Sequence, residues 1–217
     1  MDFPIFSFTI IIMKILLIGP QGCGKGTIGS MLSERLNIPL ISVGHILREL
    51  PESHPGKKEI QEHMARGELA PQGLVADLLR EETSKDSCKN GFILDGWGRT
   101  MIDLHFYDPG FDKVILINIS PETSVKRISS RRTCEDCGSV FNIISVPPKI
   151  EGICDNCGGK LSQREDDTEE AVRRRLEIYN TETSEVIEYF KKEGKLIEID
   201  GEGSPEEVFN LALEALK

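Results

Sequence analysis

The sequence predicts an α/β protein with three layers, in which helices cover both faces of a central parallel sheet. Short apolar runs at 14–18, 92–94, 114–119 and 196–199 alternate with helical patterns. Strands separated by helices pair in parallel and are buried on both faces. A glycine-rich loop follows the first run directly and opens a helix. With 217 residues, 39% of them hydrophobic, the chain can bury one good core plus small inserted subdomains.

Helices of the first half follow from apolar spacing and from residues that start or stop helices. An apolar stripe at helical spacing comes after the first strand and its loop. Another helical stretch runs from about 44 to 50. The next helix ends at Gly67, a residue suited to a C-terminal cap, and Pro71 can open the helix after it.

Helices of the second half begin at recognisable capping residues. Ser120 caps a helix in which Arg127 and Arg131, four residues apart, are expected to share a face. Asp167 and Glu170 have the spacing of a capping box, which predicts the start of a long helix. The last strand and a final helix close the chain.

The glycine-rich loop has the sequence Gly-Pro-Gln-Gly-Cys-Gly-Lys-Gly-Thr and spans 19–27. Glycines let such a loop turn successive backbone N–H groups toward an anion, and the helix that begins near Gly26 adds the positive end of its dipole. Lys25 is placed to reach the β- and γ-phosphates of a nucleotide. Strand, loop and helix in this order predict a phosphate-binding P-loop with these contact residues: Gly22, Gly24, Lys25, Gly26 and Thr27.

Two Cys-x-x-Cys pairs predict a metal site within a separate inserted segment, 133–165. Cys134 and Cys137 form one pair, Cys154 and Cys157 form the other, and a glycine follows each pair. This is the spacing of a four-thiolate zinc ribbon. Disulfides are the alternative, but Cys-x-x-Cys bridges are strained and the chain has no convincing secretory signal. Four protein ligands leave no open position, so the zinc, or a similar thiophilic metal such as iron, is expected to be structural.

The charge pattern favours small phosphorylated ligands over nucleic acid. The formal net charge is −10, which would repel a polyphosphate backbone. Positive charge is clustered instead, at 126–132 and 164–175, although solvated helix faces would look the same. Residues 1–12 resemble neither a signal peptide nor a membrane span. We expect an extension before a usual start at Met13, a cytoplasmic location and no membrane partner.

Several motifs in order resemble the adenylate kinase family, in its long form with a zinc-binding lid. The resemblance runs from Met13 to about Gly201. Its motifs are the P-loop, Ile-Ser-Val-Gly-His-Ile-Leu-Arg at 41–48, Gly-Glu-Leu-Ala-Pro at 67–71, Gly-Phe-Ile-Leu-Asp-Gly-Trp-Gly-Arg-Thr at 91–100, and the lid segments at 147–155 and 163–167. It implies four parts: an extension (1–12), a core (13–41, 72–132 and 166–217), a monophosphate-binding insert (42–71) and the lid (133–165).

The resemblance also implies a reaction and a set of roles. The reaction is reversible transfer of the terminal phosphoryl group of ATP to AMP, with Mg²⁺, by a monomer. The catalytic set is Lys25, Asp95, Arg99, Arg131, Arg164 and Arg175, with Asp95 orienting magnesium through water. Arg127 joins the P-loop residues on ATP. The monophosphate contacts are Val43, Arg48, Leu69, Gly96, Arg99 and Asp103. The zinc would hold the lid together, because about thirty residues cannot build a core alone.

Departures from the family pattern fall on the monophosphate side. Trp97 and Gly98 replace Phe and Pro before Arg99, and Asp103 falls where the family has the glutamine that reads adenine. A carboxylate only accepts hydrogen bonds, so we expect AMP to remain the best acceptor with relaxed selectivity, unless Asp103 points to solvent. Two alternatives stay open: a kinase for GMP, CMP or UMP, and a non-catalytic nucleotide-binding zinc protein.

Overall fold

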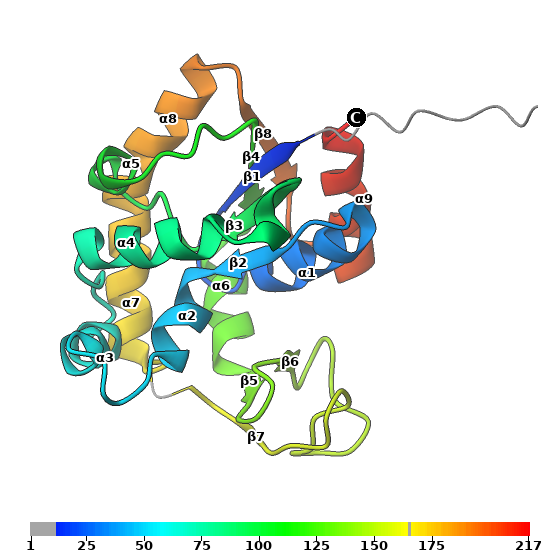
Figure 1. Ribbon diagram of the computed structural model, residues 1–217. Coiled ribbons are helices and arrows are strands. Elements are labelled where there is room, and N and C mark those ends of the chain that lie inside the picture. The colour runs from blue at the N-terminus through cyan, green and yellow to red at the C-terminus, as the bar shows by residue number, and fades with distance from the viewer. Residues whose placement is uncertain (1–11, 165) are drawn as a thin grey trace, which may run out of the picture.

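The core of the molecule is a five-stranded parallel sheet, which confirms the predicted fold class (Figure 1). The computed structural model describes residues 12–164 and 166–217, so the expected extension lies outside it except for Ile12, which is exposed. The strand order is β2 (Leu40–Ser42), β3 (Gly91–Asp95), β1 (Met13–Ile18), β4 (Lys113–Asn118) and β8 (Leu196–Asp200). The central strand β1 therefore pairs with both β3 and β4.

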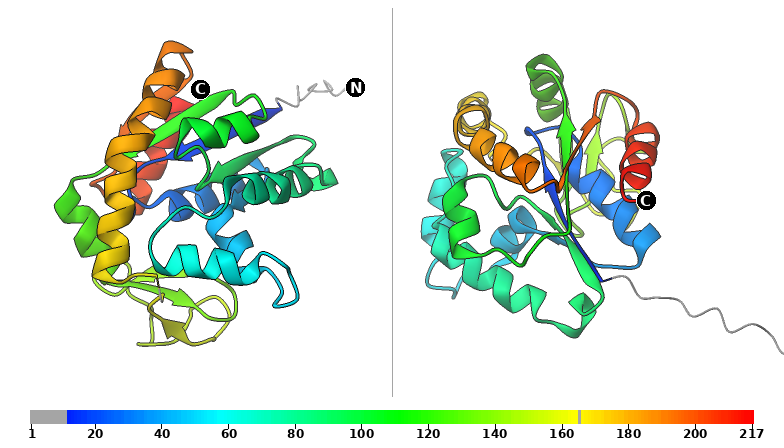
Figure 2. Two further views of the ribbon diagram at one scale, coloured as in Figure 1. Left: turned by 90° about the vertical axis from the view of Figure 1, so that its left-hand side faces the viewer. Right: turned by 90° about the horizontal axis from the view of Figure 1, so that it is seen from above.

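Alternate side chains of β1 enter two different cores, one on each face of the sheet. Ile15 and Leu17 pack in a cluster with α1 (Lys25–Leu36) and α9 (Pro205–Ala215). Leu16 and Ile18 lie in the opposite cluster, with buried residues of α4 (Gln72–Thr83) and α8 (Ser184–Lys192). The strand period of two produces this division. Figure 2 shows α1 and α9 on one side of the sheet and α4 and α8 on the opposite side.

The segment between β2 and α4 forms a small helical insert. Its helices are α2 (Val43–Glu49) and α3 (Lys57–Ala65). Gly67 follows α3 with a φ of 72°, and a Cβ at this position would lie 2.4 Å from the carbonyl oxygen of Ala171, so only glycine fits. A 3-10 turn (Asp86–Cys88) and the short helix α5 (Met101–Phe106) complete this side of the core.

The helix after β4 ends sooner than the sequence predicts. It is α6 (Pro121–Ser129), capped by Ser120, whose side chain accepts a hydrogen bond from the backbone N–H of Thr123. The expectation that Arg127 and Arg131 share one helical face is wrong, because Arg131 is the first residue of strand β5 (Arg131–Cys134). The hydroxyl of Ser130 donates to the carbonyl of Lys126 at 2.7 Å, and serine side chains that bond nearby backbone compete with helix continuation.

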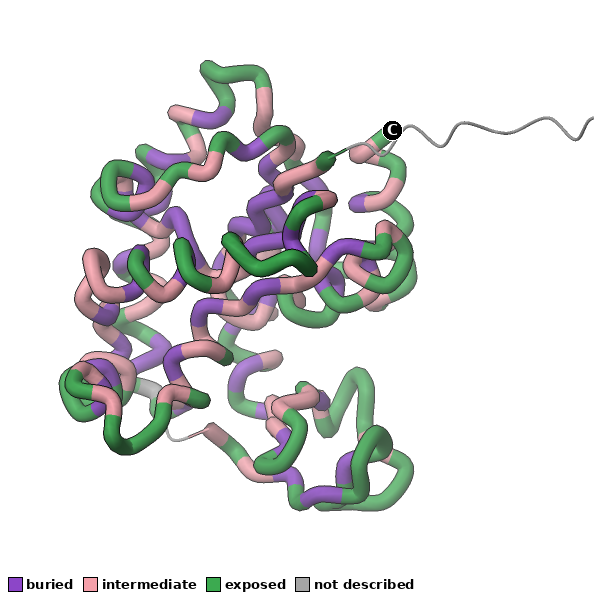
Figure 3. The backbone as a smooth tube through the Cα atoms, viewed as in Figure 1, coloured by how far each residue is buried: buried purple, intermediate pink, exposed green. Residues whose placement is uncertain are grey.

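The inserted segment forms its own small antiparallel sheet. The order is β6 (Val140–Asn142), β5 and β7 (Leu161–Ser162), and the sheet includes Arg131 and Arg132 as well as the segment 133–165. Figure 3 shows that most of this part is exposed, in contrast to the buried strands of the core. Its only cluster of buried hydrophobic residues among those described is Cys134, Phe141, Cys154 and Leu161. So small a core cannot by itself hold the segment rigid.

The chain returns to the core through α7 (Glu169–Ile178) and a π-helical segment, η2 (Tyr179–Thr183), which leads into α8. The predicted capping box is wrong. Thr168 is the N-cap of α7, because its side chain accepts from the backbone N–H of Ala171, while the carboxylate of Asp167 bonds Arg131 instead. None of the described helices has the length and apolar character that crossing a membrane would need.

Candidate active site and metal centre

All of the predicted nucleotide-binding and catalytic residues line one cleft of about 1750 Å³. The cleft lies at the carboxyl ends of β1 and β3, where open parallel sheets bind their ligands. It extends over α2 and α7 and to the cysteine-bearing segment. The sequence-predicted residues that it brings together are Gly22, Gly24, Lys25, Gly26, Thr27, Val43, Arg48, Leu69, Asp95, Gly96, Arg99, Asp103, Arg127, Arg131, Arg164 and Arg175.

The P-loop has the geometry of an anion cradle. Gly22 and Gly24 have φ values of 80° and 96°, in the left-handed region that favours glycine. Helix α1 begins at Lys25, and no described side chain caps its N-terminus, so its first N–H groups remain available to a phosphate. The ammonium group of Lys25 donates to the carbonyls of Gly19 and Pro20 at 2.7 and 3.0 Å.

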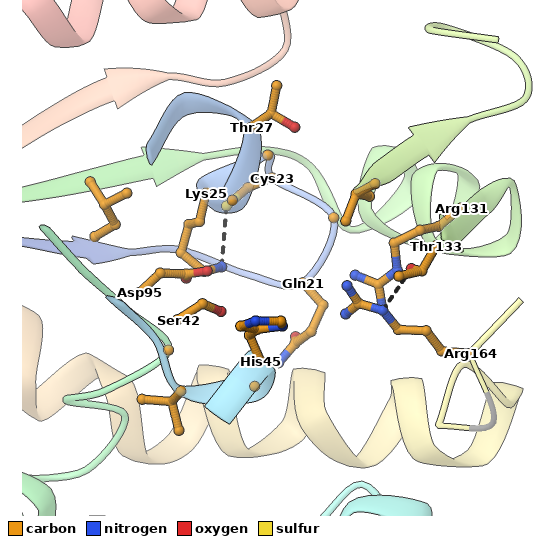
Figure 4. Close-up of a pocket in the computed structure, with 18 of the residues that line it drawn as sticks. Gln21, Cys23, Lys25, Thr27, Ser42, His45, Asp95, Arg131, Thr133 and Arg164 are labelled. Carbon is orange, nitrogen blue, oxygen red and sulfur yellow. Dashed lines mark hydrogen bonds between the residues drawn. The ribbon is translucent and has the colours of Figure 1, made fainter. Parts of the chain in front are cut away.

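Asp95 ends β3 beside Lys25 and the start of α1, as Figure 4 shows. Its Oδ1 is buried and has no hydrogen-bond partner among the described residues. A Cβ added to Gly26 would lie 4.0 Å from Asp95 Oδ2, so α1 opens close to this carboxylate. An unpartnered buried carboxylate oxygen next to a phosphate cradle fits water or a hydrated Mg²⁺ ion.

Three arginines of the cleft are held in place by neighbouring side chains, two by carboxylates and one by a hydroxyl. Arg131 forms a two-pronged pair with Asp167, with its Nε at 2.9 Å from Oδ2, and the Asp167 side chain is fully buried. Arg175 bonds Asp166, with 3.2 Å between NH1 and Oδ2. The Nε of Arg164 donates to the hydroxyl of Thr133 at 2.9 Å (Figure 4). These contacts fix the guanidinium planes before any ligand arrives.

The arginines carry more positive charge than the neighbouring aspartates neutralise. Burial, followed by repulsion from Arg131 and Arg48, lowers the pKa of Arg164 to about 9. Burial also lowers the pKa of Arg48 and of Arg175, although Asp166 opposes both shifts. At neutral pH Arg164 is still protonated, so its lowered pKa means that positive charge is crowded in the cleft. A polyphosphate would relieve this repulsion.

Arg127 connects the P-loop side of the cleft to the loop after β8. Its guanidinium donates to the carbonyls of Gly201, Glu202 and Gly203, at 2.9, 3.1 and 3.3 Å. The carboxylate of Glu202 in turn accepts from the N–H of Ser120, at the start of α6. The loop 201–203 is thereby fixed against α6, where it lines the cleft.

Asp103 lies in the cleft and is buried. The residue is only 3% exposed, so the prediction that it points to solvent is wrong. Its Oδ2 accepts from the backbone N–H groups of Arg99 and Thr100 at 2.8 and 3.2 Å, and the hydroxyl of Thr100 accepts from the N–H of Asp103, which makes a capping box at α5. Burial raises the pKa of Asp103, while these backbone hydrogen bonds oppose the rise.

The loop that carries Arg99 is held from the opposite side as well. The hydroxyl of Thr183, in the π-helical segment, donates to the carbonyl of Arg99 at 2.8 Å. The indole N–H of Trp97 donates to the carbonyl of Tyr107 at 2.8 Å. Asp103 and Thr183 thus fix both backbone groups of Arg99, in a loop where Gly98 stands in place of the proline of the family pattern.

The four predicted metal-ligating cysteines come together at one point. Their sulfur atoms all lie within 4.8 Å of one another, with 3.4 Å between Cys134 and Cys157 and 3.6 Å between Cys137 and Cys154. Tetrahedral zinc, with Zn–S bonds of about 2.3 Å, needs sulfur atoms about 3.8 Å apart. The donor set therefore fits Zn²⁺.

The two cysteine turns also have matching backbone hydrogen bonds. Gly138 N–H donates to the carbonyl of Cys134, and Gly158 N–H donates to that of Cys154, at 3.1 and 2.9 Å. Both glycines have positive φ, of 70° and 78°. A hydrogen bond from the hydroxyl of Ser139 is the largest effect that lowers the pKa of the Cys137 thiol, to about 6. The two turns thus bring their sulfur atoms to one point.

Sequence reasoning missed several residues that shape the cleft. Asp166 lay within a quoted motif but was given no role, and Asp167 was assigned to a helix cap. Thr183 carries no local signal, because its partner, Arg99, is distant in the sequence. Gln72 follows the helix-opening Pro71 and donates through Nε2 to the hydroxyl of Thr100 at 2.8 Å. Its position after a proline gives no indication of that contact.

Comparison with known proteins agrees with the geometry. Residues 17–195 match the family model described as adenylate kinase. The chain is 45% identical over 198 residues to an adenylate kinase of Thermosipho africanus, covering 87% of this chain and 92% of the relative. Similar relatives occur in Thermosipho melanesiensis (43% over 214 residues, 94% and 100% covered) and Caldicellulosiruptor bescii (42% over 214 residues, 94% and 98% covered), both adenylate kinases. The chain belongs to the adenylate kinase family.

Proposed function

We propose that the cleft holds ATP at the P-loop and AMP beside Arg48 and Arg99, so that the γ-phosphoryl group passes directly between them. Membership of the family gives the chain its reaction, in which ATP and AMP form two ADP. The observation that carries the assignment of roles is the convergence of the P-loop and six arginines on one cleft. A cleft of about 1750 Å³ has room for two nucleotides, since single small-molecule sites span about 300–1,000 Å³.

On the donor side, the loop amides and Lys25 bind the β- and γ-phosphates. Lys25 exchanges its bonds to the Gly19 and Pro20 carbonyls for bonds to phosphate oxygens. Asp95 would hold Mg²⁺ through water, and its unpartnered oxygen supports this role. The ion, when bound, neutralises charge on the phosphate oxygens. Arg127 and the loop 201–203 border the rest of the nucleotide.

On the acceptor side, Arg48 and Arg99 bind the monophosphate while Val43, Leu69 and Gly96 border its nucleoside. Arg131, Arg164 and Arg175 then neutralise charge on the group in transfer. Phosphoryl transfer needs little covalent work from a protein, so alignment and charge neutralisation supply most of the rate enhancement. The buried guanidinium groups are suited to that task, because three of them share only two neighbouring carboxylates, those of Asp166 and Asp167.

The cysteine-bearing segment acts as a lid whose rigidity comes from structural zinc. We retain the division into a core (13–41, 72–132 and 166–217), an insert (42–71) and a lid (133–165). Arg164 lies in the lid and Arg131 precedes it, so closure of the lid would carry both over the phosphates and exclude water. One chain supplies every site residue, which supports a monomeric enzyme. Zinc thiolates are stable in a reducing compartment, which supports the cytoplasm.

The test is steady-state kinetics of ADP formation with ATP and each of AMP, GMP, CMP and UMP. We expect AMP to be the best acceptor. Lys25→Ala and Arg131→Ala should each lower kcat about a thousandfold or more, as for other phosphate-clamping arginines. Arg132→Ala is the matched control, because Arg132 follows Arg131 in β5 but does not line the cleft. Near-normal turnover of either site variant would contradict the assignment.

A further inference from the structure

The acceptor side of the cleft contains a glutamine amide whose orientation is fixed by the protein. Gln72 is the first residue of α4, is half-buried and lines the cleft. Its Nε2 donates to Thr100 Oγ1 at 2.8 Å. The amide also lies near enough to the carboxylate of Asp103 to lower its pKa, against the larger effect of burial. Two acceptors therefore face the nitrogen end of this amide.

With its nitrogen so engaged, the amide of Gln72 presents its carbonyl oxygen on the opposite side. Among the residues that the structure describes, none donates a hydrogen bond to Gln72 Oε1. Of its neighbours, Asp103 Oδ2 already accepts from two backbone N–H groups, and Thr100 Oγ1 accepts from Gln72 and from the Asp103 N–H. Oε1 of Gln72 is thus an open acceptor at this point of the cleft.

The surroundings of Gln72 suit a flat heterocycle. Val43, Ala70 and Val75 line the same cleft and are nearly fully buried, and Leu69 lines it as well. Val75 lies three residues after Gln72 on α4, so the two share one helix face. Apolar walls with one correctly placed polar group are the usual composition of a site that recognises a base.

We propose that Gln72, and not Asp103, reads the base of the acceptor monophosphate, and that it selects a purine with an exocyclic amine at position 6. This inference rests on the proposed function for the location of the monophosphate. Gln72 Oε1 accepts a hydrogen bond from the 6-amino group of adenine. The 6-oxo group of guanine or hypoxanthine would instead place an oxygen lone pair against the lone pairs of Gln72 Oε1. Asp103 acts as the positioning residue that fixes both the loop of Arg99 and the amide of Gln72.

The test is equilibrium binding of three monophosphates by isothermal titration calorimetry: AMP, inosine monophosphate, and purine riboside 5′-monophosphate, which lacks any group at position 6. The protein as it stands should prefer AMP over the unsubstituted analogue by about tenfold, the scale of one hydrogen bond, and over inosine monophosphate by more. Gln72→Met keeps the length of the side chain and removes the amide. It should abolish the preference for AMP, leave binding of the unsubstituted analogue unchanged, and improve binding of inosine monophosphate.

Two further variants separate recognition from structure. Gln61→Met, at an exposed glutamine of α3 that also lines the cleft, is the matched control and should keep the preference for AMP. Asp103→Asn should lower the melting temperature and also keep most of the preference. The proposal is overturned if Gln72→Met retains the preference, if it weakens AMP and the unsubstituted analogue equally, or if only Asp103→Asn removes the preference. Binding is measured without turnover. A failure of phosphoryl transfer would therefore refute the proposed function, whereas the binding preferences would still test the role of Gln72.

Discussion

The order of the lid should depend on its metal far more than on its own packing. Apart from the two buried cysteines, the buried hydrophobic residues of the lid cluster are Phe141 and Leu161. Burial of a large apolar side chain contributes about 1.5–3 kcal/mol, so the pair contributes about 3–6 kcal/mol. A structural zinc site contributes about 10–16 kcal/mol. Cys154→Ser removes a buried ligand and should therefore unfold the lid.

The core should survive that change, because neither of its two hydrophobic clusters includes a residue of 133–165. Calorimetry should show a core transition shifted by only a few degrees, and hydrogen exchange should show loss of protection confined to the lid. Turnover should fall at least a hundredfold, since Arg131 and Arg164 border the lid and lose their positions. Metal analysis should find one zinc per chain in the original protein and almost none in the variant.

Cys88→Ser provides the matched control, since Cys88 is a buried thiol in a 3-10 turn outside the lid. It should retain the metal, the lid protection and the activity. The reasoning is refuted if the lid amides of the original protein stay protected after complete chelation. It is also refuted if Cys154→Ser unfolds the whole molecule in one transition, because the lid would then be part of the core.

Two further predictions concern the arginines. Burial beside Arg131 and Arg48 lowers the pKa of Arg164 to about 9, so its charged form destabilises the empty protein below that pH. Arg164→Gln should therefore raise the melting temperature at pH 7, by about 2–4 °C for each kcal/mol of destabilisation that it removes. This gain should shrink above pH 9, and kcat should be strongly reduced. An unchanged or lower melting temperature at pH 7 would contradict the prediction. Thr183→Val removes the hydrogen bond to the Arg99 carbonyl and should lower kcat/KM for AMP about tenfold. Thr181→Val, at an exposed position of the same π-helical segment, should not reproduce that loss.

Much of the fold could be predicted because its signals are local. Apolar runs located the strands, and the capping residue Ser120 located the start of α6. The two errors at helix ends have one cause. Ser130 bonds back to Lys126 and ends α6, and Asp167 leaves the cap position to Thr168 because Arg131 competes for its carboxylate. A partner 36 residues away decides that competition, and no local pattern contains it.

The residues of the site also differ in how far local sequence determines their positions. Motif residues such as Lys25 and Asp95 could be assigned because their spacing and their place after a strand determine where they lie. Asp103 could be aligned but its contacts could not be foreseen, because they depend on how α4 approaches α5 and brings Gln72 against Thr100. Thr183 is of the same kind, since the π-helical turn that aims it at Arg99 has no sequence signature. Side chains that act through tertiary contacts need the structure.

The central claim is that one cleft aligns two nucleotides for direct phosphoryl transfer, and the amount of ADP formed with and without AMP tests it most directly. Purified protein with magnesium and ATP should form two ADP for each AMP consumed and should release no inorganic phosphate. With ATP alone it should form almost no ADP. Formation of ADP and phosphate without AMP, or no ADP with both nucleotides present, would contradict the account.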